Sequence, residues 1–248
     1  MSGLSVKRVV VGAIGAIGAY LFLVLVAGLA KFETSWLPYA AELVGALIAG
    51  GALARQGTRH RFEALVAGTL SVLIIGTVAF ASPSTFGWVA VRAAYPWPTA
   101  VALAIGCGAS GQAGAWLAYG RGGLPSIVML STAVTSGLLL FGGRIVTSLA
   151  AHVMTVGSST GMAILYVCAL LAGYAVQSVV PLANAGACAS GAAILIGLNV
   201  VATEMKGQHT GGLLWLLLAV AAAFAGAVAA QALRSKPHED AASASDAR

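Results

Sequence analysis

The chain alternates between long apolar stretches and short polar segments over nearly its whole length. Between Val9 and Leu233 there are 225 residues, and only twelve of them are Lys, Arg, Asp or Glu. Eleven of these lie at or between the apolar stretches, and the exception is Glu42. A soluble domain needs a dense mixture of charges over its outer surface. The pattern therefore excludes a soluble domain and predicts a polytopic membrane protein.

Eight apolar stretches are long enough to cross a bilayer as α-helices. An α-helix rises about 1.5 Å per residue, so about 20 residues cross a hydrocarbon core of about 30 Å. The sixth and seventh stretches are nearly continuous, and we expect a tight turn near Pro181 to separate them. The predicted spans are 9–30, 37–54, 62–81, 99–118, 125–141, 161–180, 182–202 and 212–233. The sequence thus predicts an all-α fold with one transmembrane domain over residues 1–233.

The two ends of the chain carry separate expectations. Lys7 and Arg8 before an apolar run resemble a signal peptide, but the run of 22 residues from Val9 to Ala30 is longer than a usual signal core. We expect an uncleaved first helix. Residues 234–248 consist mainly of Ala, Ser and charged residues, and we expect a disordered cytoplasmic tail there.

Basic residues set the expected orientation. Eight spans place both termini on one side, and nine basic residues then share that side against four on the other. Such a bias places the richer side in the cytoplasm. The nine are Lys7, Arg8, Arg55, Arg59, Arg61, Arg121, Arg234, Lys236 and Arg248, and the four are Lys31, Arg92, Arg144 and Lys206. We therefore expect a cell-membrane protein, in the inner or plasma membrane, with both termini in the cytoplasm.

Two connections on the expected outer side have amphipathic or aromatic sequences. Residues 82–98 contain Phe86, Trp88, Tyr95 and Trp97, which is typical of a segment at the level of the lipid headgroups. Residues 143–160 place polar and apolar residues on opposite faces of a helix. We expect both segments to lie in the membrane interface.

Thirty-two glycines in a chain of helices indicate close packing. In lipid, small residues four apart let helix backbones approach each other. A self-association seam and a channel lined by small residues are the alternatives. Hairpins rich in small residues also recur about every 60 to 65 residues, which suggests a weak parallel repeat of helical hairpins. The expected packing positions are Gly12, Gly50, Gly106, Gly114 and Gly173.

Glu42 is the one charged residue inside a predicted span. A carboxylate in the membrane costs several kcal/mol unless it is paired, hydrated or neutral. It is therefore either a functional proton or cation site or a structural carboxylate. A structural carboxylate would pair with a cation expected on the same side (Lys31, Arg92, Arg144 or Lys206) or snorkel to the outer headgroups. Four uncharged polar residues extend this set of candidates. They are Gln112, Tyr174, Gln177 and Asn199, which either line a polar path or form interhelical hydrogen bonds.

Other chemistry receives little support from the residues. No phosphate loop, metalloprotease motif, nucleophile elbow or paired acid occurs in a span, so we expect no enzyme. Cys107, Cys168 and Cys188 lack metal-site spacing, and we expect neither metal nor cofactor. The net charge of +6 lies mainly at span ends, which favours lipid headgroups over nucleic acid as partners.

The isolated polar residues in otherwise apolar spans favour a small permease-like or channel-like protein for a small solute or ion. The alternative is a membrane subunit or scaffold that packs with a partner membrane protein, or with further copies of itself, through Gly/Ala-rich helix faces.

Overall fold

The computed structural model is all-α over the residues that it describes. These are residues 5–32, 34, 36–54, 60–81, 97–118, 124–151, 153, 158–179, 185–204 and 212–245. The helices are α1 (Val6–Leu29), α2 (Leu37–Leu53), α3 (His60–Ala81), α5 (Trp97–Leu117), α6 (Leu124–Ser136), the π-helix η2 (Gly137–Gly142), α7 (Gly143–Ala151), α8 (Ser158–Val179), α9 (Ala185–Glu204) and α10 (Gly212–Ser245). Because α6, η2 and α7 follow one another without a break, the described chain forms eight helical segments, as predicted.

All eight segments are apolar enough to belong to a membrane domain. Five are also long enough to cross a bilayer, and the described parts of α2, α3 and α9 provide three shorter apolar helices. The chain is therefore a multi-pass helical membrane protein by length and composition. The break expected near Pro181 is confirmed, since α8 ends at Val179 and α9 begins at Ala185.

The helix of the fifth predicted span does not end at residue 141. The backbone continues from α6 through the wider turns of η2 into α7, and Gly143 keeps right-handed helical angles of φ −58° and ψ −42°. The amphipathic stretch after Gly143 is therefore an extension of the fifth helix. Val146 and Leu149 on it are 46% and 65% exposed, which suits contact with lipid. The other expected interfacial segment, residues 82–98, lies almost entirely outside the described residues.

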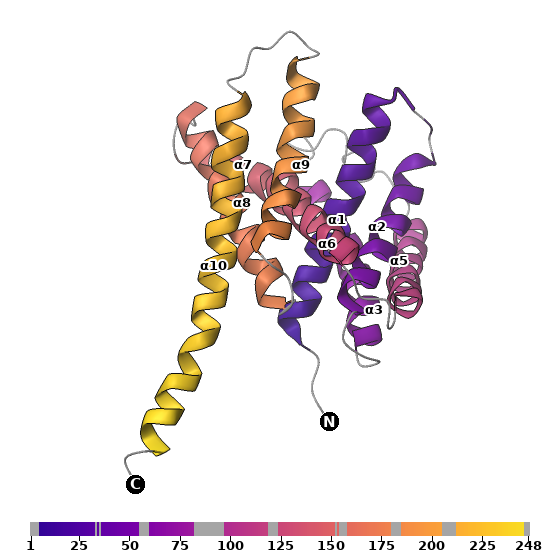
Figure 1. Ribbon diagram of the computed structural model, residues 1–248. Helices are drawn as coiled ribbons and strands as arrows, with labels where there is room; N and C mark the ends of the chain where they lie inside the picture. The colour runs from indigo at the N-terminus through magenta and orange to yellow at the C-terminus, as the bar shows by residue number, and fades with distance from the viewer. Residues whose placement is uncertain are drawn as a thin grey trace.

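The C-terminal helix also differs from the expectation. α10 remains helical through Ser245, where composition predicts a disordered tail. Extending an existing helix costs less than nucleating a new one, and Ala, Glu and Lys are good helix formers. Figure 1 shows this end of α10 reaching away from the bundle.

The helices form two groups of four. α1, α2, α3 and α5 pack together, and α6, α8, α9 and α10 form the second group. The groups meet where α1 crosses α6 and η2. Figure 1 shows α1 beginning and α10 leaving the bundle at the same end, which is here named the terminal end. The two termini lie at the same end because the described chain crosses the bundle an even number of times.

The interior is built from small residues, so backbones approach each other closely. A Cβ added at Gly50 would fall on the carbonyl oxygen of Gly111, and one at Gly114 would fall on that of Leu47. A Cβ at Gly173 would likewise fall on the carbonyl oxygen of Ala223. Dispersion between backbones at such crossings holds helices together in lipid. Gly106 is looser, because its added Cβ would be 3.1 Å from the Leu43 side chain.

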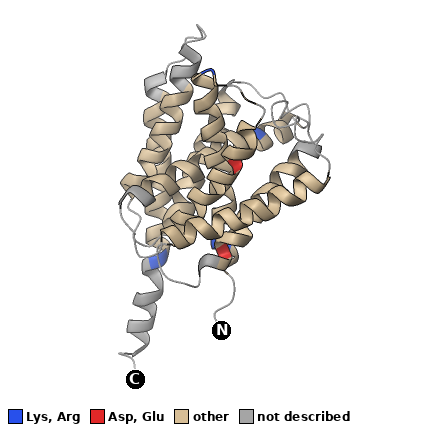
Figure 2. Ribbon diagram, turned by 90° about the vertical axis from the view of Figure 1, so that its right-hand side faces the viewer, with Lys and Arg blue, Asp and Glu red and all other residues tan. Residues whose placement is uncertain are grey.

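Charged residues are sparse, and the outer surface of the bundle is apolar. Figure 2 shows Lys, Arg, Asp and Glu at only a few places on the described chain. At the terminal end, the Ser5 backbone N–H donates to Glu63 Oε1 over 2.9 Å, which favours the start of α1. Arg234 on α10 donates to the carbonyl oxygen of Ser178, near the C-terminal end of α8. Both contacts join two helices where they leave the apolar layer.

Candidate functional site: a buried carboxylate on α2

Glu42 lies in the first half of α2, and its side chain is 2% exposed. The helix begins with Pro38 in its first turn, where the missing backbone donor costs nothing. Glu42 and Gly45 lie three positions apart and share a helix face. That face packs on α1, because a Cβ at Gly45 would come within 2.8 Å of the Ala16 carbonyl oxygen and 2.9 Å of the Tyr20 nitrogen. The carboxylate is therefore next to the α1–α2 crossing.

An apolar cluster marks the level of the carboxylate in the bundle. It joins Tyr20 of α1, Ala41 of α2, Ile75 of α3 and Phe141 of η2. Tyr20 is one of the largest fully buried side chains in the described chain. Because Glu42 is only 2% exposed, its carboxylate is shielded from water, and its charge interacts strongly with any neighbouring cation or dipole.

Of the four cations expected near Glu42, the structure describes two. Lys31 is exposed and follows the end of α1. Arg144 is exposed at the start of α7, between Phe141 and Ile145, which both pack in the same cluster as Ala41. The fifth helix therefore brings Arg144 to the level of Glu42. Arg92 and Lys206 lie outside the described residues.

The other predicted path residues do not all face the same region. Gln112 on α5 and Asn199 on α9 are exposed on the outside of their helices. Tyr174 is half-buried on α8, one turn before Gln177. Gln177 is 4% exposed, and among the described residues its Oε1 has no hydrogen-bond partner. Burial thus groups Glu42 with Gln177 and separates them from Gln112 and Asn199.

Sequence reasoning missed three hydroxyl residues on α6. Ser131, Thr135 and Ser136 are each no more than 1% exposed. The hydroxyls of Ser131 and Ser136 have no hydrogen-bond partner in the described chain, and the Cys188 thiol of α9 lies next to Ser131. The spacing of four and five positions between them was the available signal, since it places all three on neighbouring faces of a helix.

These hydroxyls lie between the levels of Glu42 and Gln177. Ser136 directly precedes η2, which reaches the Glu42 level through Phe141. Leu130 and Val134, on the same helix, pack in one cluster with Val176, the neighbour of Gln177. The fifth helix therefore carries buried polar side chains from the level of Glu42 toward the terminal end of the bundle.

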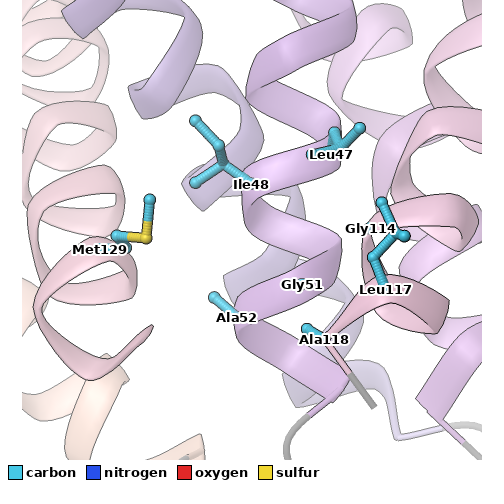
Figure 3. A pocket seen from close by; sticks show the side chains of 8 residues that line it. All are labelled: Leu47, Ile48, Gly51, Ala52, Gly114, Leu117, Ala118 and Met129. Carbon is cyan, nitrogen blue, oxygen red and sulfur yellow. The ribbon is translucent and has the colours of Figure 1, made fainter. Parts of the chain in front are cut away.

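A separate apolar groove of about 230 Å³ lies where the two helix groups meet. Ile48 and Ala52 on α2 face Met129 on α6, as Figure 3 shows, and α5 closes one side with Gly114 and Leu117. No candidate polar residue lines this groove. The groove can therefore contact an apolar group, but it provides no polar side chain for binding or catalysis.

The remaining chemical groups add no further site within the described part of the chain. The three cysteines there are free and buried. No cluster of three or more His, Cys, Asp or Glu suited to a metal ion occurs in it. His152 and His209 lie outside the described residues.

Comparison of the chain with protein-family models, curated proteins and solved structures finds no match. The fold and composition define the class on their own: the chain is a multi-pass helical membrane protein.

Proposed function

We propose that this protein is a small permease-like or channel-like protein that moves protons or small monovalent cations past Glu42. The burial of Glu42 carries the proposal. Ionisable side chains inside membrane spans are costly and are commonly kept for ion or proton pathways. A carboxylate that is 2% exposed in an otherwise apolar bundle fits this role.

The buried polar residues of the fifth helix support a route from this carboxylate. Ser136, Thr135 and Ser131 provide oxygen atoms along α6, and Gln177 provides an amide near the end of α8. Hydroxyl and carbonyl oxygens are suitable ligands for a partly dehydrated cation, and hydroxyls also relay protons. The revised path is therefore Glu42, Ser136, Thr135, Ser131 and Gln177. Gln112 and Asn199 leave it because they are exposed.

The experiment measures ion flux in proteoliposomes of the purified full chain. Proton entry is followed with an internal pH dye under a potassium diffusion potential, and rubidium uptake is followed separately with a tracer. Glu42→Gln keeps the size of the side chain and removes its charge. Glu63→Gln is the matched control, because Glu63 is also buried but lies at the terminal end, bound to the Ser5 backbone.

We expect wild-type protein and Glu63→Gln to carry protons or rubidium faster than empty vesicles, and Glu42→Gln to lose at least about 90% of that flux. Glu42→Asp should restore part of it, because the charge returns on a shorter side chain. Wild-type flux no higher than that of empty vesicles, for both ions, would overturn the proposal. An unchanged flux in Glu42→Gln would remove Glu42 from the path.

A scaffold or partner subunit is the second candidate. The close glycine crossings and the apolar groove beside Met129 favour it, because they supply packing surfaces without polar chemistry. In that case wild-type protein carries no flux. Purification in mild detergent would instead recover a stable homo-oligomer or a complex with another membrane protein.

A further inference from the structure

The two groups of four helices pack in the same order. In the first group α1 contacts α2 and α3, and α5 contacts the same two helices. In the second group the fifth helix (α6, η2 and α7) contacts α8 and α9, and α10 contacts the same two helices. The first and last helices of a group are not close neighbours in either case. Each group is therefore a ring of four helices with the same connectivity.

The closest crossing within each ring is built from equivalent residues. In the first group an added Cβ at Gly50 meets the carbonyl of Gly111, and one at Gly114 meets that of Leu47. In the second group a Cβ at Gly173 meets the carbonyl of Ala223, and one at Gly226 meets that of Leu170. Leu47 and Gly50 thus correspond to Leu170 and Gly173, with the same spacing. Gly111 and Gly114 correspond to Ala223 and Gly226 in the same way.

The contact between the groups is reciprocal. A Cβ added at Gly18 of α1 would fall on the Ala133 carbonyl of α6. A Cβ added at Gly137 of η2 would fall on the Ile14 carbonyl of α1. Gly18 corresponds to Gly137, and Ile14 to Ala133, at one common separation along the chain. When two residues touch, and the counterparts of both residues touch in the same way with the two units exchanged, the units are related by a two-fold axis.

The remaining helix pair follows the same correspondence. A Cβ at Gly12 of α1 would lie 2.9 Å from the Ala67 Cβ on α3. The separation along the chain that relates Gly18 to Gly137 also relates Gly12 to Ser131. A Cβ added at Gly191 of α9 would lie 2.6 Å from the Ser131 carbonyl carbon. Ala67 therefore corresponds to Gly191.

The buried faces agree as well. Ala46, Ala49 and Gly50 are buried on α2, and their counterparts on α8 are the buried residues Ala169, Ala172 and Gly173.

We infer that the chain is a tandem repeat of two four-helix units, residues 5–118 and 124–234, related by an approximate two-fold axis that passes between α1 and the α6–η2 helix. The correspondence holds for all four pairs of equivalent helices, and the offset in residue number is constant within each pair. The described residues of each unit form four membrane helices, so both units begin at the same end of the bundle, and the axis runs along the membrane normal. The repeat therefore contains four helices, twice the length of the hairpin repeat that the sequence suggests.

The units differ at the proposed ion site. Glu42 corresponds to Leu165, and Gly51, which lines the apolar groove, corresponds to Tyr174. The carboxylate is therefore present in one unit only, and Tyr174 takes the position of a glycine that lines the groove in the other unit. The inference of a repeat is based on helix packing alone. A failure of the proposed ion flux would therefore not contradict it.

Distances between spin labels test the two-fold axis in the full-length protein. Val44, Ile105, Val167 and Leu217 are 44%, 67%, 56% and 59% exposed, so labels there face lipid. The correspondence pairs Val44 with Val167, and Ile105 with Leu217. The background replaces the three native cysteines with alanine, which already stands at the counterparts of Cys107 and Cys188. Double electron–electron resonance then compares the pair 44/217 with the pair 167/105.

We expect the two pairs to give the same mean distance within the width of the distributions. A second comparison uses Trp116 and its counterpart Val228, which are 63% and 45% exposed, in the pairs 44/228 and 167/116. It also replaces the first if a labelled variant fails to fold. A difference between the mean distances that exceeds the distribution widths in either comparison overturns the two-fold relation.

Discussion

At the scale of single residues, the turn after α1 contains a side chain in an unfavourable backbone conformation. Lys31 has φ 54°, in the left-handed region where a Cβ is costly. Its backbone N–H donates to the Gly28 carbonyl over 3.1 Å, and the Phe32 N–H donates to the Ala27 carbonyl over 2.9 Å. This pair of bonds is the Schellman motif, in which glycine is the preferred residue at the position of Lys31.

Lys31→Gly should therefore stabilise the protein by about 0.5–1 kcal/mol. Lys31→Ala is the control, because it removes the same charge but keeps the Cβ, and it should bring no such gain. The measurement is the unfolding midpoint of purified protein in detergent. Equal midpoints for the two variants would show that the backbone conformation at this turn carries no cost.

Glu42 offers the second residue-scale prediction. If it is an ion site, Glu42→Gln removes the cost of holding a charge away from water, so thermal stability should hold or rise while flux is lost. Breaking a structural buried ion pair would instead cost about 3–5 kcal/mol. The same detergent unfolding measurement decides, with Arg144→Gln and the double variant completing a cycle. Non-additive losses in that cycle would identify Arg144 as the partner of Glu42.

Sequence reasoning identified Glu42 because a lone charge in an apolar block is visible without a structure. It overlooked Ser131, Thr135 and Ser136, because hydroxyl residues in membrane helices usually bond to their own backbone and give no distinct signal. It could not show that Gln112 and Asn199 are exposed, because the absence of periodicity in a chain this apolar hides which face of a helix is buried.

At the scale of helices, glycine is required where two backbones touch and is dispensable elsewhere. Gly50→Ala and Gly173→Ala place a Cβ on a facing carbonyl, so the helices must separate. We expect each change to cost about 1–3 kcal/mol. Gly76→Ala and Gly197→Ala are matched controls, since nothing lies within 4 Å of an added Cβ at either position. The controls should be neutral or slightly stabilising.

Unfolding in a graded mixture of mild detergent and dodecyl sulfate measures these four variants. A loss at Gly50 with none at Gly173 would contradict the equivalence of the α2–α5 and α8–α10 crossings. Losses at Gly76 or Gly197 as large as those at the crossings would show that helix propensity, and not close approach, sets the effect.

The existence of the helices followed from the sequence more surely than their ends did. Apolar length alone located eight segments, and Pro38 and Pro98 marked the first turns of α2 and α5. Nothing comparable marked the join between α6 and α7. Polar residues after Gly143 suggested an interfacial helix, whereas the π-helical turns of η2 continue the chain in one helix by tertiary packing against α1. A local pattern cannot report such a long-range contact.

At the scale of the whole molecule, the paired helix groups constrain topology. Four helices in each group return the chain to its starting side twice, once between α5 and α6 and once after α10. From the charge bias of the sequence we expect that side to face the cytoplasm. The count of basic residues assumes eight spans, and the two groups of four helices supply that number, so both give the same arrangement of the loops.

Fusions of a reporter that is active only in the cytoplasm test this arrangement. We expect activity for fusions after Ala118 and after Arg234, because each follows a complete group of four helices. We expect no activity for a fusion after Ala202, which follows the seventh helical segment. A phosphatase that is active only outside the cytoplasm should give the opposite pattern at all three positions. The absence of a cytoplasmic signal after Ala118 would break the parallel arrangement of the two units, because an odd number of crossings would then separate their first helices. A cytoplasmic signal after Ala202 would contradict the three crossings expected between the start of the second unit and that position.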